Sequence, residues 1–413
     1  MEKYFEKHLF SKPQIETPIR ADAGIVIVIP CFAEKHLINT LQSLKNCILP
    51  NCSAEVIIVI NSGENTKEEI LNINEKTYTE AVQWIGKNGT EKIKFYLIRV
   101  DNLPAKHAGV GLARKIGMDE AAGRFETINN SDGIIVCFDA DCTCEINYLV
   151  EIEKHFLLHP RSPACSIYFE HPIKGNDFSD EVYEGIIRYE LFLRYYIQGL
   201  RYAQYPFAYH TIGSSMAVRS EVYQKQGGMN KRKAGEDFYF LHKIIPLGNF
   251  SEINSTKVIA SPRPSSRVPF GTGRSIQKWL DNETKIYKVY HPQIFMDLKI
   301  FIETIPLLYT TDFSTVAEKL PDPVKQFLKE NNIEVKIKEV KENAGSQLQF
   351  IKRFYNWLDG FRMLKYIHFA RDKFYGEIEI TEAANLLLEM KGSSHASDLK
   401  ELLMLFRDLD KGM

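Results

Sequence analysis

The stretch that decides the fold is Gly133-Ile134-Ile135-Val136-Cys137-Phe138-Asp139-Ala140-Asp141, an apolar run that ends in two carboxylates. Its length and its β-branched residues are typical of a buried strand. Carboxylate oxygens at the end of such a strand suit Mg²⁺ or Mn²⁺, and Mg²⁺ bound to a protein is usually shared with substrate phosphates. The other interpretation is that Asp139 and Asp141 cap a following helix. A second such triplet, Asp408-Leu409-Asp410, lies in a polar tail where we expect a solvated helix end.

Three more β-branched runs come before this strand, at residues 25–29, 56–60 and 93–98. Longer amphipathic segments between the runs predict helices at residues 34–47, 65–84 and 106–122. This alternation predicts βαβ units around a largely parallel sheet. Ligands of such sheets bind outside the carboxyl ends of the strands. We therefore expect the polar segments after the four strands to converge on one rim: residues 30–34, 61–64, 99–102 and 139–141.

The next stretch, residues 166–269, combines aromatic and glycine-rich segments. Its pattern predicts a helix at 181–205, a strand at 209–219, and an amphipathic helix that opens with Glu236-Asp237 and is closed by Pro246. Acidic residues in the first turn of a helix offset its dipole, so capping is one interpretation of Glu236 and Asp237. The loop 261–274 is rich in Pro, Gly, Ser and Arg, which predicts a boundary or a mobile lid.

Residues 275–413 are mostly helical in pattern and contain no catalytic signature. We predict helices at 276–290, 293–305, 324–331, 347–369, 381–390 and 398–409. Such an appendage could supply packing, an acceptor wall or a face for a homo-oligomer.

The composition excludes several classes of protein. The 413 residues carry 52 basic and 53 acidic side chains, and the net charge of -1 gives no global attraction to nucleic acid or to anionic membranes. Seven cysteines, an odd number without paired short spacings, favour reduced thiols over a disulfide framework. No stretch approaches the ~20 apolar residues of a transmembrane segment. We therefore expect a soluble, cytoplasmic protein.

The segment 103–117 is punctuated by Gly109, Gly111 and Gly117. This spacing fits neither the dinucleotide fingerprint nor a phosphate loop. What remains is a glycine-punctuated helix on which Lys106 and Arg114 can face phosphates, or form a solvated basic face.

Taken in order, these motifs resemble the family 2 glycosyltransferases of the GT-A fold, over about residues 24–250. Val28-Ile29-Pro30-Cys31-Phe32-Ala33-Glu34 is like the family's IPxYNE start, and Val59-Ile60-Asn61-Ser62-Gly63 is like its VDDGS strand end. The remaining landmarks are the segment 109–117, like GxxxARNxG, then Phe138-Asp139-Ala140-Asp141, Gly213 to Arg219, Gly227-Gly228 and Gly235-Glu236-Asp237.

The resemblance implies an α/β protein of the GT-A type, with a mixed sheet flanked by helices and a mostly helical C-terminal region. It divides the chain into an N-terminal extension (1–23), a glycosyltransferase domain (24–270, with a nucleotide-binding half 24–145 and an acceptor half 146–270) and a helical region (271–413). The implied activity is metal-dependent transfer of a sugar, with inversion, from a nucleotide-diphosphate donor to a hydroxyl of a glycan, a lipid-linked molecule or a small molecule.

The resemblance also implies roles for single residues. Pro30, Phe32 and Glu34 would lie beside the nucleoside, and Asn61 would meet the base. Lys106 and Arg114 would lie near the diphosphate or the base. Asp139 and Asp141 would hold the nucleotide and a Mn²⁺ or Mg²⁺ ion. Asp237, with Glu236 beside it, would be the general base that takes the acceptor proton.

Two positions depart from the family pattern. Asn61 stands where the family usually has Asp, and because an amide both accepts and donates, the base preference stays open. Lys115 replaces the usual Asn. The absence of a QxxRW-type sequence argues against a processive synthase.

Other features have two interpretations each. Arg263, Arg267 and Arg274 could close over the diphosphate or belong to a basic linker. His210 and His291 are not assigned as metal ligands. The aromatic cluster around Tyr195 has the helical spacing of core residues, and a sugar-stacking surface is the alternative.

Three other functions remain open at this point. On the same fold, the chain could be a retaining synthase of small glycosides or a nucleotidyltransferase. A non-catalytic scaffold that has kept the sheet is the third.

Overall fold

The computed structural model describes residues 2–265, 267 and 270–412, so Ser266, Val268 and Pro269 of the loop 261–274 lie outside the described residues. The chain forms two compact units. The first consists of Met1–Phe178 and Thr211–Arg274, and the second of Ser179–His210 and Ser275–Met413. The domain bounds inferred from the sequence divide the chain differently, because they place residues 179–210 in the glycosyltransferase domain.

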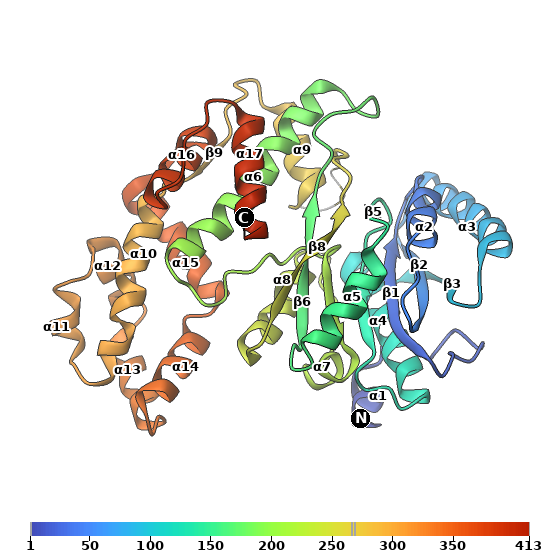
Figure 1. Ribbon diagram of the computed structural model, residues 1–413, viewed down its shortest axis with the longest axis horizontal. Helices are drawn as coiled ribbons and strands as arrows, with labels where there is room; N and C mark the ends of the chain where they lie inside the picture. Colours follow the sequence, from blue (N-terminus) through green and yellow to red (C-terminus); the bar gives the residue numbers. More distant parts are fainter. Residues whose placement is uncertain (1, 266, 268–269, 413) are drawn as a thin grey trace. The chain divides into compact units, whose positions relative to one another are not determined.

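The first unit is built on an eight-stranded mixed sheet with the order β3-β2-β1-β4-β7-β6-β8-β5 (Figure 1). The four expected strands are confirmed as β1 (Ala23–Cys31), β2 (Ser53–Gly63), β3 (Ile93–Leu103) and β4 (Ile134–Cys137), and they run parallel. The other four are β5 (Thr143–Cys144), β6 (Ala164–Glu170), β7 (Met216–Arg219) and β8 (Ser251–Ile259). Strand β7 is antiparallel to β4 and β6, and this reversal makes the sheet mixed.

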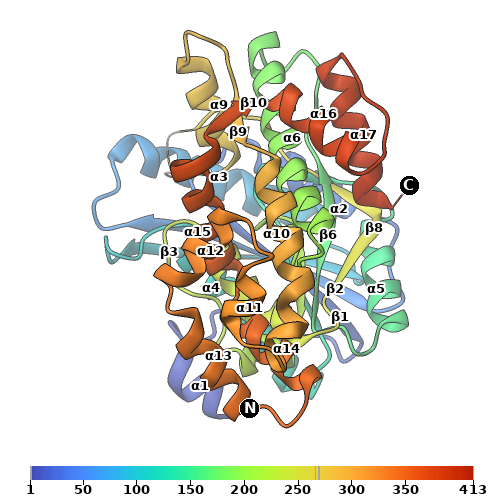
Figure 2. The same cartoon turned by 90° about the vertical axis from the view of Figure 1, so that its left-hand side faces the viewer.

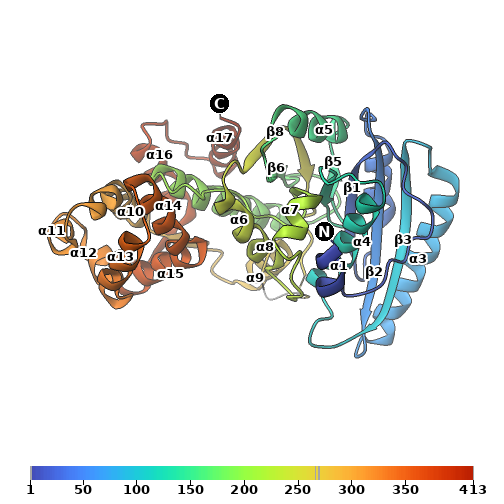
Figure 3. The ribbon, with the colours of Figure 1, turned by 90° about the horizontal axis from the view of Figure 1, so that it is seen from below.

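Helices cover both faces of the parallel half. Figure 3 shows α3 (Glu68–Asn88) on one face of β1–β3 and α4 (Val110–Thr127) on the other. Helix α4 packs closely on the sheet, since a Cβ at Gly117 would lie 2.4 Å from Val28 Cγ1 of β1. The remaining helices of the unit are α1 (Glu2–His8), α2 (Leu37–Lys45), α5 (Tyr148–Leu158), α7 (Ser220–Lys225), α8 (Glu236–Ile244) and the 3₁₀ turn η1 (Ile245–Leu247).

The second unit is helical, and Figure 2 shows α10 (Gln293–Thr304) beside α6 (Asp180–Tyr202). Its other elements are α9 (Thr272–Asp281, which begins in the first unit), η2 (Ile305–Tyr309), α11 (Phe313–Ala317), α12 (Asp322–Glu330), α13 (Ile333–Glu342), α14 (Gln347–Trp357), α15 (Gly360–Ala370), η3 (Arg371–Tyr375), α16 (Ile380–Met390) and α17 (Leu399–Lys411). Tyr195 of α6 is buried and packs on Phe295, as the core interpretation expected.

Three predicted elements were wrong in extent. The strand expected at 209–219 is only the four residues of β7. The helix expected at 276–290 ends at Asp281, and its last part is β9 (Lys288–Tyr290), which pairs with β10 (Glu377–Glu379). The helix expected at 347–369 is broken, because the Asp359 side chain accepts a hydrogen bond from Arg362 N and starts α15 anew.

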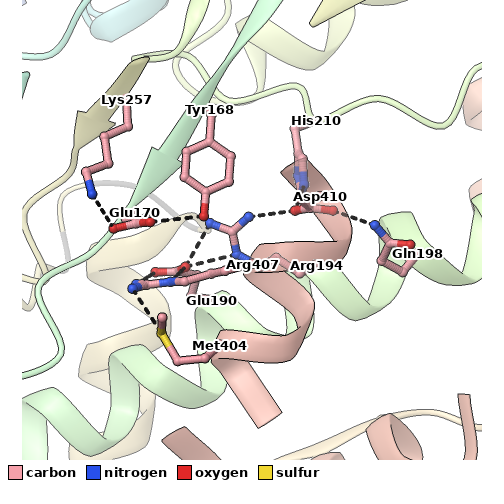
Figure 4. A network of polar contacts seen from close by, with 10 residues as sticks. All are labelled: Tyr168, Glu170, Glu190, Arg194, Gln198, His210, Lys257, Met404, Arg407 and Asp410. Carbon is pink, nitrogen blue, oxygen red and sulfur yellow. Dashed lines mark hydrogen bonds and ion pairs between the residues drawn. The ribbon is translucent and has the colours of Figure 1, made fainter. Parts of the chain in front are cut away.

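The C-terminal helix α17 is held to α6 by buried charges (Figure 4). Arg194 binds Asp410 at 2.6 Å and Glu190 at 2.8 Å, and Arg407 binds Glu190 at 2.7 Å. His210 Nε2 lies 2.9 Å from Asp410. The expectation of a solvated helix end at Asp410 was therefore wrong, because tertiary ion pairs bury that carboxylate. Figure 4 also draws Tyr168, Glu170 and Lys257 of the first unit, where Glu170 accepts from Tyr168 Oη at 3.0 Å and pairs with Lys257 at 3.0 Å.

Candidate active site

The polar segments after the parallel strands do meet on one rim of the sheet. The turn after β4 is attached to α2, because Thr40 Oγ1 donates a hydrogen bond to Ala140 O at 2.9 Å. Asn74 of α3 holds the turn after β1, because its Oδ1 accepts a hydrogen bond from Ala33 N at 2.8 Å. Asn74 also donates to Asn61 O at 3.0 Å. These contacts fix the segments around Phe32, Asn61 and Asp139 relative to one another.

Asn61 carries a buried oxygen without a partner. The residue is 2 % exposed, and among the described residues no donor reaches its Oδ1. Buried acceptors in native structures nearly always have a donor, so this oxygen needs one that the described chain does not supply and that a water molecule or a ligand can provide. The position is the one expected to meet a nucleotide base.

Arg114 lies at the centre of the site, in the N-terminal part of α4. The residue is 1 % exposed, and its Nη2 donates to Asp139 Oδ1 at 2.6 Å while its Nη1 donates to Glu236 Oε1. The backbone at Gly213 leaves room for this guanidinium, since a Cβ there would lie 2.8 Å from Arg114 Nη1. Arg114 therefore joins the turn after β4 to the start of α8.

Asp237 occupies the first turn of α8. Its Oδ1 accepts a hydrogen bond from Phe238 N at 2.7 Å, and a Cβ at Gly213 would lie 3.0 Å from its Oδ2. Burial raises the pKa of Asp237, although the nearby Arg114 guanidinium lowers it. Burial likewise raises the pKa of Glu236, against the effect of its ion pair with Arg114. Capping does not account for Glu236, because its carboxylate is directed to Arg114 and makes no cap to its own helix.

A second arginine bridges the acidic groups of the rim. Arg263 binds Glu34 through both guanidinium nitrogens, at 2.5 and 3.2 Å, and its Nη2 also lies 3.0 Å from Asp141 Oδ2. Glu34 is buried, and Arg267 Nη1 donates to Phe32 O at 2.5 Å. Arg263 and Arg267 thus contact the rim directly.

The other predicted site residues differ in their burial and in their partners. Pro30 is buried within β1, and Lys106 is exposed in the turn before α4. Lys115, one of the two departures from the family pattern, is buried and pairs with Asp119 at 2.9 Å. His210 and His291 have structural partners, respectively Asp410 and Gln293 N. The sequence analysis named Gly213 only as a landmark and missed its close approach to Arg114, for which a glycine before Ser214-Ser215 was the available signal. It also missed the Glu34–Arg263 pair.

The residues of the Asp139-Ala140-Asp141 turn fit a divalent cation by chemistry. Both carboxylates are partly open, with side-chain exposures of 38 % and 29 %. Among the residues that the structure describes, no group of three or more His, Cys, Asp or Glu side chains forms a metal site. Two carboxylates suffice for Mg²⁺ when substrate phosphates and water complete its shell.

The chain was compared with known proteins. The family model described as Glycosyl transferase family 2 matches residues 26–227. No curated protein matches the chain. Among solved structures, S. aureus TarS 1-349 is 12% identical over 78% of this chain and 90% of that chain, with a TM-score of 0.40. The same TarS segment in complex with UDP-GlcNAc is 13% identical over 94% and 92%, with a TM-score of 0.38. Such scores are too low to argue from.

The sheet order and the family match confirm the expected fold class, a GT-A mixed sheet flanked by helices with a mostly helical C-terminal region. No helix in the described part of the chain is long and apolar enough to cross a membrane.

Proposed function

We propose that this chain, a glycosyltransferase with a family 2 domain at residues 26–227, transfers a sugar from a nucleotide-diphosphate donor to a hydroxyl group of an acceptor. The transfer inverts the configuration of the anomeric carbon. The observation that carries the proposal is buried Arg114, which binds both Asp139, on the donor side, and Glu236, the neighbour of the base. One guanidinium thereby fixes the donor turn and the catalytic helix against each other.

The donor binds along the carboxyl ends of the parallel strands. The orphan Asn61 Oδ1 accepts a hydrogen bond from the nucleotide base, next to Phe32 and Glu34. Pro30 shapes the end of β1 beneath the nucleoside. Lys106, exposed before α4, is available to the diphosphate. Arg114 acts through its ion pairs, because its two bound carboxylates leave it little freedom to reach a phosphate.

Asp237 is the general base. As the acceptor oxygen attacks the anomeric carbon, its proton passes to the Asp237 carboxylate, and the electron pair of the broken C–O bond leaves with the nucleoside diphosphate. The Phe238 N–H bond fixes one oxygen of this carboxylate. Because burial raises the pKa of Asp237, transfer should be lost on acidification at a higher pH than an ordinary aspartate would require.

Asp139 and Asp141 are the residues that would hold Mn²⁺ or Mg²⁺. When bound, such an ion supplies positive charge to the diphosphate leaving group. The two carboxylates must then exchange part of their present pairing with Arg114 and Arg263. Donor binding measured by calorimetry should weaken after chelation with EDTA and return with Mn²⁺; equal affinity in both conditions would remove metal dependence from the proposal.

The decisive experiment separates donor binding from transfer. A thermal-shift panel of nucleotide sugars identifies the donor, since a ligand that binds the native state raises its apparent stability. With that donor, Asp237→Asn should keep donor affinity and lower the transfer rate by ~10²- to 10⁴-fold. Asp132→Asn, at a 72% exposed carboxylate, is the matched control and should change neither. Normal turnover of Asp237→Asn would remove the base assignment.

Product analysis tests the chemistry itself. The anomeric configuration of the product, read by NMR, separates inversion from retention, and release of pyrophosphate would instead indicate nucleotidyl transfer. Failure to bind any nucleotide sugar in the presence of Mn²⁺ would favour a scaffold. A fragment that ends at residue 270 lacks the α17 residues that pair with Glu190 and Arg194, so whether it folds tests the proposed extent of the glycosyltransferase domain, 24–270. If it folds, its acceptor binding and self-association, compared with those of the full chain, test the role of residues 271–413.

A further inference from the structure

Two cysteines of the first unit lie with their sulfur atoms close together. Cys47 follows α2, and Cys144 is the second residue of β5. The two residues are 97 positions apart in sequence, yet their Sγ atoms are 3.6 Å apart. A disulfide needs a separation of about 2.05 Å. A shift of roughly 1.5 Å, within the reach of side-chain rotation and small backbone movement, would therefore join them.

The surroundings of the pair make the two sulfurs unequal. Cys47 Sγ donates to Ser43 O at 3.5 Å and to Glu145 O at 3.7 Å, and it lies near the N–H groups of Tyr148 and Leu149 at the start of α5. The hydrogen bond with Cys144 lowers the pKa of Cys47 most, burial opposes it, and these backbone N–H groups lower it further. The same thiol contact and burial raise the pKa of Cys144. A helix N-terminus favours a thiolate, so Cys47 is the nucleophile and Cys144 keeps its proton.

The other five cysteines lack this arrangement. Cys31, Cys137, Cys142 and Cys165 are buried, and burial raises the pKa of each thiol. Cys52 is partly exposed, but burial of its sulfur raises its pKa to about 12. Thiols that keep their protons react slowly with oxidants.

We propose that Cys47 and Cys144 are a redox modification site, a dithiol that a peroxide converts into a disulfide. The Cys47 thiolate attacks one oxygen of hydrogen peroxide, the O–O bond breaks, and Cys47 becomes a sulfenic acid while hydroxide leaves. The Cys144 sulfur then attacks the Cys47 sulfur and its proton leaves with the departing oxygen as water. The two thiols are oxidised by two electrons, and the peroxide is reduced to the level of water.

The bond would have a defined place in the fold. It would attach the end of α2 to β5, the short strand that starts two residues after Asp141 and pairs with β8. Oxidation of these two thiols does not depend on the transfer reaction.

Thiol counting on the full chain tests the proposal. After treatment with hydrogen peroxide, quenching and denaturation, a maleimide–polyethylene glycol reagent should label five cysteines where the untreated protein shows seven. Peptide mapping should find residues 47 and 144 in one cross-linked pair, and dithiothreitol should restore seven labels. Retention of all seven, or a cross-link between other cysteines, would overturn the proposal.

Single variants provide the matched controls. Treatment of Cys47→Ser should not remove two labels together, because this variant lacks the nucleophile. Cys52→Ser, which alters a thiol outside the pair, should still lose two of its six labels under the same treatment. A disulfide that still forms at Cys144 in the treated Cys47→Ser protein would contradict the assignment. The wild-type count remains decisive even if a serine variant folds poorly.

Discussion

Removal of the Arg114 side chain should destabilise the protein chiefly through Glu236. The Arg114 and Glu236 side chains are only 2% and 4% exposed, whereas that of Asp139 is 38% exposed. Breaking a buried ion pair by removing one partner typically costs about 3–5 kcal/mol, because the remaining charge is buried without compensation. The partly exposed Asp139 can be solvated, so losing its pair adds at most about 1 kcal/mol. We therefore expect Arg114→Ala to cost roughly 3–5 kcal/mol.

The pH dependence of this cost identifies Glu236 as its source. Without Arg114, burial and the neighbouring Asp237 and Asp139 carboxylates would hold the folded pKa of the Glu236 carboxyl above the unfolded value of about 4.3. The native state then binds the proton more tightly than the unfolded state. The penalty is therefore absent below about pH 4.3, grows as the pH rises toward the folded pKa, and is complete above it.

Equilibrium urea unfolding of four proteins measures these quantities. The wild type, Arg114→Ala and the double variant Arg114→Ala/Glu236→Gln are compared at pH 5 and at pH 8, and the double variant should recover part of the loss because residue 236 no longer carries a charge. Arg99→Ala, which removes exposed ion pairs with Glu75 and Asp101, is the control and should cost under about 1 kcal/mol. A loss below about 1 kcal/mol for Arg114→Ala, or a loss that does not grow with pH, would refute the reasoning.

Three further outcomes follow from single contacts. Asn61→Ala should leave the urea midpoint nearly unchanged but weaken donor binding by about 1 kcal/mol, roughly fivefold in Kd by calorimetry, because the orphan oxygen is lost. Interactions with His210 and Arg194, working against burial, hold the pKa of Asp410 well below its usual range. Its stabilisation is thus complete above about pH 3.9 and declines as the pH falls toward the folded pKa, and Asp410→Asn should cost about 1.5–3 kcal/mol at neutral pH and less at pH 2. Gly117→Ala should cost about 1–3 kcal/mol in urea unfolding because its Cβ would meet β1, whereas Gly86→Ala, with open space around it, should stabilise α3 by about 0.5–1 kcal/mol.

The parallel half of the fold could be predicted because its signals are local. Each buried strand is a short β-branched run, and the chain between two runs has a helical period, so the four strands and the rim follow from neighbouring residues alone. One error falls where a distant residue decides. The expected helix at 276–290 gives way to β9 because its last residues pair with β10, about 90 positions later.

The charge pairs of the site could not be predicted for the same reason. The partners of Arg114 are 25 and 122 residues away, and the partner of Glu34 is 229 residues away. Periodicity showed only that Arg114 lies on a helix and carries a charge. The glycines of that helix were the better signal, since Gly111 and Gly117 mark where α4 touches a backbone or a strand, which places the intervening Arg114 in the interior.

The balance of charge at the site explains why Arg114 and Arg263 differ. Five carboxylates face three guanidinium groups, a formal excess of two negative charges: Glu34, Asp139, Asp141, Glu236 and Asp237 against Arg114, Arg263 and Arg267. A diphosphate would add to this excess, and at 4 Å each like-charged pair costs on the order of 4 kcal/mol at the effective dielectric constant of a protein surface. The proposed donor therefore needs added positive charge at Asp139 and Asp141. Buried Arg114 cannot leave Glu236 without the cost worked out above, whereas Arg263, 23% exposed, can release Asp141. Arg263 should thus give up its pair with Asp141, whereas Arg114 can release the partly exposed Asp139 and still hold Glu236 and helix α8 in place throughout.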